Sequence, residues 1–486
     1  MIASKMGNNS KFFFVLLSVS AAIGIGNIWV YPYGSYKYGG LFIIPYLIAL
    51  IVLGVPLLML EFSIGQYFNK NVVDLFASIR KGFSSIGWLI LFNAFILMSV
   101  YAVVLSWSIT YFFVSFGLQW KNDSKSYFFN NVLQVSDGFK SFLQFSLPVF
   151  IALILAWLIV FLYIRKGFES IKKYYSATFV VFIFLMLLFM AYSLALDNAL
   201  NGIYAFLKPN LKSLIDLKVW VSASSLAMLS LGLSFGVMPA FARKSGRGFI
   251  IANSFIVAVF KFLISIAVGF IVFGILGFLS AKQGLSLDSL AFSDFGSSFV
   301  VLTQALPFLY KPTLFSLLFF IFLSIIFIFA ATSLAYSASH VLVHKFNTQR
   351  RNAAVIVSGF GFLFGLLFII KPGFYIMDIM VHFIYYNILI AVLLEVIAVG
   401  WFFDFEKISQ HINQNSELKI GGIWRFFIRY IAPLIIVLLL FFQLKSDFLL
   451  NYKNYPWIYV MIFGVGTVAF PIILAFLMPQ KILDKR

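Results

Sequence analysis

Long apolar runs recur along the chain from end to end, separated by short polar segments. Each run has about 20 residues or more, enough for an α-helix to cross a hydrocarbon core of roughly 30 Å. The pattern predicts an all-α integral membrane protein with about twelve membrane-spanning helices. Their expected ranges are 12–36, 41–67, 86–116, 146–164, 173–196, 218–243, 249–280, 313–343, 352–370, 374–403, 424–445 and 456–478.

Two of these runs are interrupted in the middle. The first contains GIGNIWVYPY, from Gly24 to Tyr33, and the sixth contains SLGLSFGVMP, from Ser230 to Pro239. Glycines alone would also suit close packing of helices. However, backbone groups freed by a helix break are tolerated at membrane depth only where they line a cavity or are buried in protein. Because the first and sixth spans begin two sets of five, the paired breaks indicate a transporter binding site near the bilayer midplane.

This pairing predicts the domain organisation. Residues 12–403 would form a transport core, a five-plus-five inverted repeat with broken helices 1 and 6. Repeat one would cover 12–196 and repeat two 218–403. Two peripheral helices in 424–478 would remain, as candidates for packing between two copies of the chain in a homodimer.

Composition and charge agree with a membrane protein. Of 486 residues, 62% are hydrophobic and 10% are charged, too few charges for a soluble domain of this length. Most of the 35 basic residues fall in the short segments on the side of the two termini. By the positive-inside rule, both termini are expected in the cytoplasm of a multi-pass cell-membrane protein. The net charge of +19 then needs no nucleic-acid partner.

Several motifs carry a family resemblance. The stretch SAAIGIGNIWVYPYGSYKYGGLFIIPYLIALIVLGVPLLMLEFSIGQY resembles the start of the neurotransmitter:sodium symporters, the family that includes the bacterial leucine transporter. The similarity continues through GLSFG, DFGSSFVVLTQAL, ATSLAYS and VIAVGWFFDFEKI, and covers roughly residues 10–405. It implies a sodium-coupled amino-acid symporter that works by alternating access.

The resemblance also implies a substrate site. Tyr101 matches the tyrosine that binds the substrate carboxylate, and Phe235 matches the aromatic lid. Gly24 stands where monoamine-transporting relatives carry aspartate, which leaves room for a carboxylate and favours an amino acid over a bare amine. The sequence does not name that amino acid. The implied substrate-binding residues are Ala22, Gly24, Gly26, Leu97, Tyr101, Leu229, Ser230, Gly232, Phe235, Lys261, Ser333 and Ser337.

Two sodium sites are known in this family. For the second, the resemblance implies backbone and hydroxyl oxygens of Ser20, Ile23, Phe329, Thr332 and Ser333, a donor set that suits a hard cation. A Thr-Ser pair within a helix can instead bond its own preceding carbonyls. For the first site, the matches are Ala22, Asn27 and Ser230, but the expected asparagine of span seven is replaced by Lys261.

Lys261 lies about twelve residues into its span, where a charge is costly and is a functional hypothesis by default. Reaching an interface through its long stem is the alternative. We expect its ammonium to occupy the place of the first sodium ion and to bind the substrate carboxylate. Two unit charges about 4 Å apart at an effective dielectric near 20 interact by about 4 kcal/mol, enough to exclude sodium there. One sodium per cycle follows. A lysine that releases its proton would give proton-coupled transport or exchange, and the sequence leaves this open.

Other matched residues concern chloride and the gates. Ser265 and Tyr46 match a chloride site, but the glutamine of that site is replaced by Leu226, so chloride dependence is not expected. Glu61 and Glu395 are read as supports that hydrogen-bond the broken part of span six, with proton relay as the alternative. Asp378 is a candidate for the external gate.

Three other classes of function remain as rivals. An amino-acid sensor with the same fold would bind without transport. A channel is disfavoured because the site has broken helices and no ring of charges. An enzyme is disfavoured because no catalytic constellation or nucleotide motif appears. The expected partners are therefore an amino-acid substrate, Na+ and the lipid bilayer.

Overall fold

A computed structural model describes residues 2–121, 123–136, 138–142, 144–245, 249–287, 290, 298–414, 419–449 and 452–478. Within these ranges every regular element is a helix, and the only extended pairing is a single bridge between Phe145 and Ile370. The all-α membrane fold predicted from the hydropathy pattern is confirmed.

The helices of the membrane region follow the predicted spans closely. Ten uninterrupted helical stretches are long and apolar enough to cross a bilayer, and a bent pair adds an eleventh among the described residues. The sixth predicted span consists of α11 and α12, which are separately too short to meet that criterion. The helices are α1 (Ile2–Ala21), α2 (Tyr31–Tyr38), α3 (Ile43–Ala49), α4 (Val55–Phe68), α6 (Ser84–Val114), α8 (Leu147–Ile164), α9 (Phe168–Leu194), α11 (Leu217–Ser230), α12 (Val237–Ala242), α13 (Ile250–Gln283), α15 (Pro312–Lys345), α16 (Arg350–Gly365), α17 (Gly373–Phe402), α20 (Ala432–Leu449), α21 (Trp457–Tyr459) and α22 (Gly466–Leu477).

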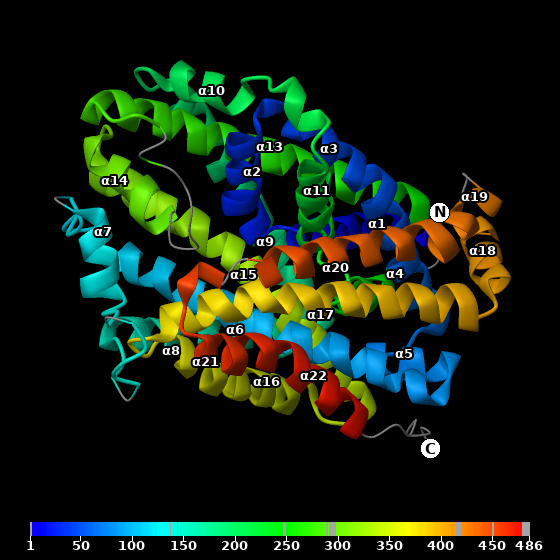
Figure 1. Cartoon of the computed structure of the whole chain (residues 1–486). Coiled ribbons are helices and arrows are strands. Elements are labelled where there is room, and N and C mark those ends of the chain that lie inside the picture. The colour runs from blue at the N-terminus through cyan, green and yellow to red at the C-terminus, as the bar shows by residue number, and fades with distance from the viewer. Residues whose placement is uncertain are drawn as a thin grey trace.

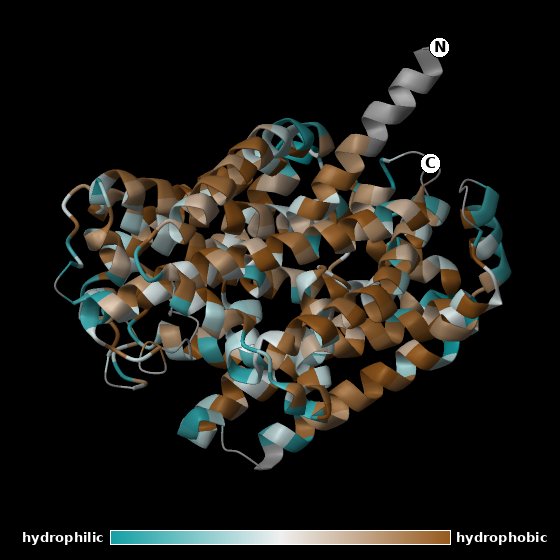
Figure 2. Ribbon diagram, turned by 90° about the horizontal axis from the view of Figure 1, so that it is seen from above, coloured by the Kyte–Doolittle hydropathy of each residue, from teal (hydrophilic) through white to brown (hydrophobic). Residues whose placement is uncertain are grey.

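Shorter helices lie in the connections. α7, α10 and α14 lie at one end of the bundle, whereas α5, α18 and α19 lie at the other end (Figure 1). Ribbons coloured by hydropathy are mostly hydrophobic along the long helices, and hydrophilic stretches gather at their ends and connections (Figure 2). The short helices are α5 (Val72–Ile79), α7 (Ser124–Ser126), α10 (Ala199–Leu207), α14 (Thr303–Ala305), α18 (Phe405–Gln414) and α19 (Gly422–Phe426).

Close helix contacts depend on small residues. A Cβ atom added at Gly65 of α4 would lie 2.5 Å from the carbonyl oxygen of Pro239 in α12. At Gly202 of α10, the added atom would lie 1.8 Å from the carbonyl oxygen of Phe273 in α13. Glycine at these positions lets two backbones approach directly, as is common in membrane helices. The contact at Gly65 holds the second half of the broken sixth span against α4.

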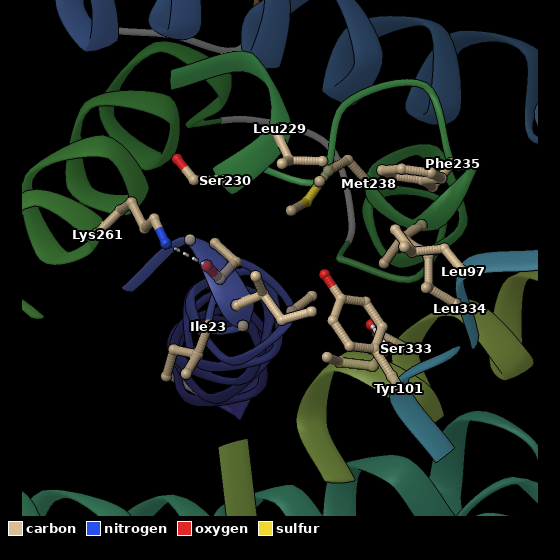
Figure 3. A pocket seen from close by; sticks show the side chains of 18 residues that line it. Ile23, Leu97, Tyr101, Leu229, Ser230, Phe235, Met238, Lys261, Ser333 and Leu334 are labelled. Carbon is tan, nitrogen blue, oxygen red and sulfur yellow. Dashed lines mark hydrogen bonds between the residues drawn. The ribbon is translucent and has the colours of Figure 1, made fainter. Parts of the chain in front are cut away.

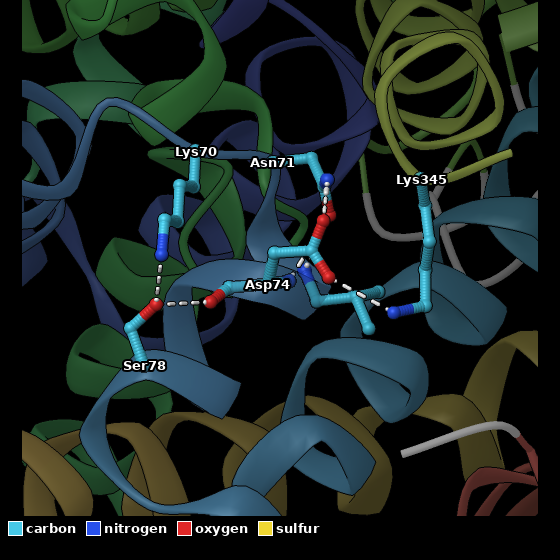
Figure 4. A network of polar contacts seen from close by, with 6 residues as sticks. Lys70, Asn71, Asp74, Ser78 and Lys345 are labelled. Carbon is cyan, nitrogen blue, oxygen red and sulfur yellow. Dashed lines mark hydrogen bonds and ion pairs between the residues drawn. The ribbon is translucent and has the colours of Figure 1, made fainter. Parts of the chain in front are cut away.

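A polar network joins α5 to the end of α15 (Figure 4). Asn71 caps α5, because its Oδ1 accepts hydrogen bonds from the backbone N–H groups of Val73 and Asp74, both at 3.1 Å. Lys345 Nζ lies 2.9 Å from Asp74 Oδ1, and the Lys345 side chain is only 1% exposed. A buried ion pair therefore connects the short helix to α15, which carries part of the candidate site.

Candidate functional site

The first break separates two helical segments that meet at 63°, Phe12–Ala21 and Gly26–Tyr38. The side chain of Asn27 compensates for part of the lost helical bonding, because its Oδ1 accepts a hydrogen bond of 3.2 Å from the Gly24 N–H. The backbone N–H of Asn27 donates in turn to the Gly24 carbonyl, at 3.0 Å. The predicted break in span one is thus present, and an asparagine side chain caps it.

Lys261 of α13 also lies at this break. Its Nζ donates to the carbonyl oxygen of Ala22 at 2.9 Å and to Oδ1 of Asn27. Asn27 Nδ2 donates to Ser265 Oγ at 3.1 Å, and Tyr46 OH lies 3.2 Å from the same oxygen. The lysine is 1% exposed. Its ammonium therefore binds two oxygens that the resemblance assigned to the first sodium ion.

The second break, between α11 and α12, has left-handed backbone at three positions. Gly232 and Gly236 both have φ of +68°, and Ser234 has φ of +54°. Glu61 Oε1 accepts a 2.6 Å hydrogen bond from the Ser234 N–H, and Ser234 Oγ donates to Glu395 Oε2 at 2.7 Å. Two buried carboxylates from α4 and α17 thus bind the same residue of the unwound segment.

Ser337 of α15 holds Phe235, the residue that follows Ser234 in the unwound segment. The resemblance implied that this serine contacts substrate, but it does not line the cavity described below. Its Oγ instead donates a 2.9 Å hydrogen bond to the carbonyl oxygen of Phe235, the proposed lid residue. The serine therefore fixes the backbone that carries the aromatic ring.

A small cavity of about 30 Å³ lies between the two breaks. That volume suits about one or two water molecules. Lys261 and Ser230 lie on one side of it, and Tyr101 and Ser333 on another, with apolar side chains around the rest (Figure 3). The residues proposed to bind substrate that line the cavity are Ala22, Gly24, Gly26, Leu97, Tyr101, Leu229, Ser230, Gly232, Phe235, Lys261 and Ser333.

Met238 and Leu334 also line this cavity, together with Val237 and Ala330. Figure 3 shows Met238 between Leu229 and Phe235, and Leu334 beside Leu97. Sequence reasoning missed these residues, although Met238 follows the GLSFG motif and Leu334 directly follows the Thr-Ser pair. With Leu97 and Leu229, they make one part of the wall entirely apolar.

Three of the five proposed ligands of the second sodium site, Phe329, Thr332 and Ser333, lie on α15. Tyr175 of α9 approaches two of its oxygens, because its hydroxyl lies 3.0 Å from the Phe329 carbonyl oxygen and 2.8 Å from Thr332 Oγ1. Thr332 Oγ1 donates to Ile328 O at 2.5 Å, and Ser333 Oγ to Ala330 O at 3.0 Å, the local bonding expected of hydroxyls in a helix.

The remaining proposed ligands of that site, Ser20 and Ile23, lie at the end of α1, where the Ile23 N–H donates to the Ser20 carbonyl at 3.1 Å. All five proposed ligands would offer oxygen, which suits a hard cation such as Na+. Nothing in the sequence pointed to Tyr175, whose segment, IKKYYSATF, carries no motif.

Asp378, the gate candidate, belongs to a different cluster. Its carboxylate accepts hydrogen bonds from Lys453 Nζ at 2.9 Å and from Tyr455 OH at 3.1 Å, both in the connection between α20 and α21. One turn further along α17, His382 Nε2 lies 2.6 Å from Asp447 Oδ2 of α20. Polar contacts therefore attach α17 to the last part of the chain.

The chain matches the sodium:neurotransmitter symporter family over residues 6–127 and 119–483. It is 32% identical, over 94% of both chains, to an uncharacterized sodium-dependent transporter of Methanocaldococcus jannaschii. It is 28% identical to the sodium- and chloride-dependent GABA transporter 2 of Mus musculus, covering 92% of this chain and 82% of the relative. A sodium-dependent dopamine transporter of Caenorhabditis elegans is 25% identical, with the same coverage. The structure has two broken helices around a buried cavity, and the sequence is similar to these transporters over its whole length. The chain belongs to the sodium:neurotransmitter symporter family.

Proposed function

We propose that the protein is a sodium-coupled amino-acid symporter of the cell membrane, with both termini in the cytoplasm, in which Lys261 replaces one of two sodium ions. The observation that carries the proposal is the position of the Lys261 ammonium. It is hydrogen-bonded to Ala22 O and Asn27 Oδ1 at the edge of the cavity between the two helix breaks. The match to the sodium:neurotransmitter symporter family, and the similarity to a sodium-dependent transporter, support coupling of transport to sodium.

The substrate carboxylate would lie between Lys261 and Tyr101. A Cβ atom at Gly24 would lie 3.4 Å from the Tyr101 hydroxyl, so the space beside this hydroxyl depends on glycine. An ammonium and a phenol hydroxyl would both donate to a carboxylate, and charge-assisted hydrogen bonds are the stronger kind. The apolar wall with Met238 and Leu334 suits an amino acid with an apolar side chain.

One sodium ion would then suffice. It would bind at the second site, to Ser20, Ile23, Phe329, Thr332 and Ser333, whereas the ammonium of Lys261 would repel a cation at the first. We propose no requirement for chloride, because Leu226 stands at the position of the glutamine in the chloride site.

The size of the cavity supports alternating access. A volume of about 30 Å³ is far below the roughly 300–1,000 Å³ of pockets that hold small molecules. An amino acid therefore enters only when the walls separate. The broken spans α1–α2 and α11–α12 would move against α6 and α15, which supply Tyr101 and Ser333.

Proton-coupled transport is a second candidate function, and the surroundings of Lys261 are the observation that favours it. The lysine bonds only neutral oxygens, and among the described residues no carboxylate lies within ion-pair distance of its Nζ. A buried ammonium without a counterion is costly at membrane depth. The carboxylate of a bound substrate could neutralise the ammonium of Lys261, or the ammonium could lose its proton.

Uptake of a panel of amino acids into proteoliposomes, under a sodium gradient or a pH gradient, tests the proposal. For the wild type we expect sodium-driven uptake with a Hill coefficient for sodium near one. Lys261→Asn restores the expected first-site ligand and should move the coefficient toward two. Lys261→Met removes the charge without supplying an oxygen, and should lose uptake.

Three results would contradict the proposal in different ways. Uptake driven by the pH gradient and indifferent to sodium would make Lys261 a proton carrier. Specific amino-acid binding without uptake or counterflow would identify a sensor. A Hill coefficient of about two for the wild type would mean that Lys261 does not exclude the first ion.

A further inference from the structure

A second, much larger cavity lies away from the substrate site. Its volume is about 840 Å³, and its walls come from α6, α15, α16, α17 and α22 together with the π-helical segment Val460–Val465 that leads into α22. We call it the α22 cavity. Side chains from each of these helices line it, among them Trp88, Phe95, Ala338, Phe360, Met380 and Phe470.

The walls of the α22 cavity offer almost nothing to a polar ligand. None of the residues that line it is charged. The hydroxyl of Thr467 is already used, because it donates to the Phe463 carbonyl oxygen at 2.5 Å. Recognition of an ion, a sugar or an amino acid requires polar groups that converge on it. The chemistry of the lining therefore selects a hydrocarbon.

The position of the cavity identifies the source of that hydrocarbon. Apart from Phe346 and Met478, which lie one residue beyond their spans, its walls belong to helical stretches long and apolar enough to cross a bilayer. Lipid chains therefore surround this part of the protein, and each leaflet supplies chains that reach about 15 Å, half of the hydrocarbon core. An unfilled apolar space of this size would forfeit the dispersion contacts that its walls could make.

The size of the cavity suits a lipid chain. Its volume of about 840 Å³ lies within the range of about 300–1,000 Å³ typical of ligand sites. A helix of a second copy is the other apolar occupant, and the experiment below separates the two.

We propose that the α22 cavity binds the acyl chain of a membrane lipid. The site is independent of the proposed transport function, since none of its residues belongs to the substrate cavity. Its residues nevertheless lie next to residues of the proposed transport site. On α6, Ile96 lines the lipid site and Leu97 the substrate cavity. On α15, Ala338 lines the lipid site and directly follows Ser337, which holds the backbone of Phe235.

Trp88 provides a reporter inside the site. The residue is 2% exposed, and its ring lies 6.1 Å from the ring of Phe92 and 6.2 Å from that of Phe346. We would reconstitute the full chain in vesicles of phosphatidylcholine, either plain or brominated along the acyl chain, and record tryptophan fluorescence. Subtracting the signal of Trp88→Phe isolates Trp88 from the other tryptophans among the nine in the chain. We expect brominated lipid to remove more than half of the Trp88 emission.

Variants that fill the cavity test whether the quenching chain lies inside it. Ala338→Leu and Gly466→Leu each add a side chain to the wall, and an atom added at Gly466 has no neighbour closer than 3.8 Å. Gly359→Leu is the matched control, because Gly359 lies in α16 outside the lining, with nothing within 4 Å. We expect either filling variant to abolish most of the quenching and the control to keep it.

Two results would overturn the proposal. Trp88 emission that is equal in plain and brominated lipid would mean that no acyl chain enters. Quenching that persists in both filling variants would place the lipid elsewhere. If Trp88 is unquenched and cross-linking between copies captures α22, a second copy covers the cavity and lipid does not.

Discussion

Replacing Tyr175 with phenylalanine should tighten sodium binding. The Tyr175 hydroxyl lies 3.0 Å from Phe329 O and 2.8 Å from Thr332 Oγ1, two proposed sodium ligands. Thr332 donates its own hydrogen to Ile328 O. The single phenol hydrogen is therefore shared between the two oxygens, and it competes with a cation for their lone pairs.

The expected change in sodium affinity follows from the loss of that one phenol hydrogen. Losing one neutral hydrogen bond costs a protein about 0.5–1.5 kcal/mol net. If the bond exists only without sodium, Tyr175→Phe destabilises the sodium-free state alone, and sodium affinity rises by the same free energy. With 1.4 kcal/mol for each factor of ten, the dissociation constant for sodium should fall roughly two- to twelve-fold.

Thermal unfolding of the purified protein measures this without knowledge of the substrate. A ligand that binds only the folded state raises the melting temperature with its concentration. We would titrate NaCl against choline chloride at constant ionic strength. Tyr174→Phe is the matched control, since Tyr174 precedes Tyr175 on α9 and its ring packs 4.9 Å from that of Tyr163. A sodium affinity that is unchanged or weaker in Tyr175→Phe, relative to Tyr174→Phe, would refute the competition.

Three further predictions concern other parts of the molecule. Gly24→Asp should abolish amino-acid uptake while the protein still folds, because the new side chain enters the space beside the Tyr101 hydroxyl; uptake and size-exclusion chromatography check this. Asp74→Asn should cost about 3–5 kcal/mol of stability by leaving the buried charge of Lys345 without its carboxylate, and adding Lys345→Met should recover part of the loss in thermal unfolding. Ser337→Ala removes the hydrogen bond to Phe235 O and should raise KM for uptake several-fold, with a smaller loss of stability, about 0.5–1.5 kcal/mol. An unchanged KM would mean that the serine does not position the lid.

Much of the fold could be predicted because hydropathy and helix breaks are local signals. The expected range 374–403 became Gly373–Phe402, and 146–164 became Leu147–Ile164. The break in span one was visible because glycine, asparagine and proline interrupt a single apolar run. These features depend on a residue's near neighbours along the chain, which a sequence displays directly.

Contacts between helices could be predicted less well. The depth of Lys261 followed from its place in its span, but its two partners belong to another helix. Tyr175 and Met238 reach their sites through the rotation of α9 and α12 about their axes, and neither helix carries a polar stripe that reveals this rotation. Asp378 was considered as a gate, yet it contacts Lys453, which is 75 residues further along the chain.

The contacts of α17 with the end of the chain have a consequence for biosynthesis. Asp378 and His382 enter the membrane with α17, but their partners Lys453 and Asp447 are synthesised later. Until then, these ionisable side chains of α17 lack their final partners, and a part-buried charge without a partner is costly. A ribosome-bound chain that ends after Phe402 should therefore remain exposed to membrane chaperones and proteases. Translation of α20 and the segment that follows it would end this interval, so the last two spans complete the assembly of the helices made before them.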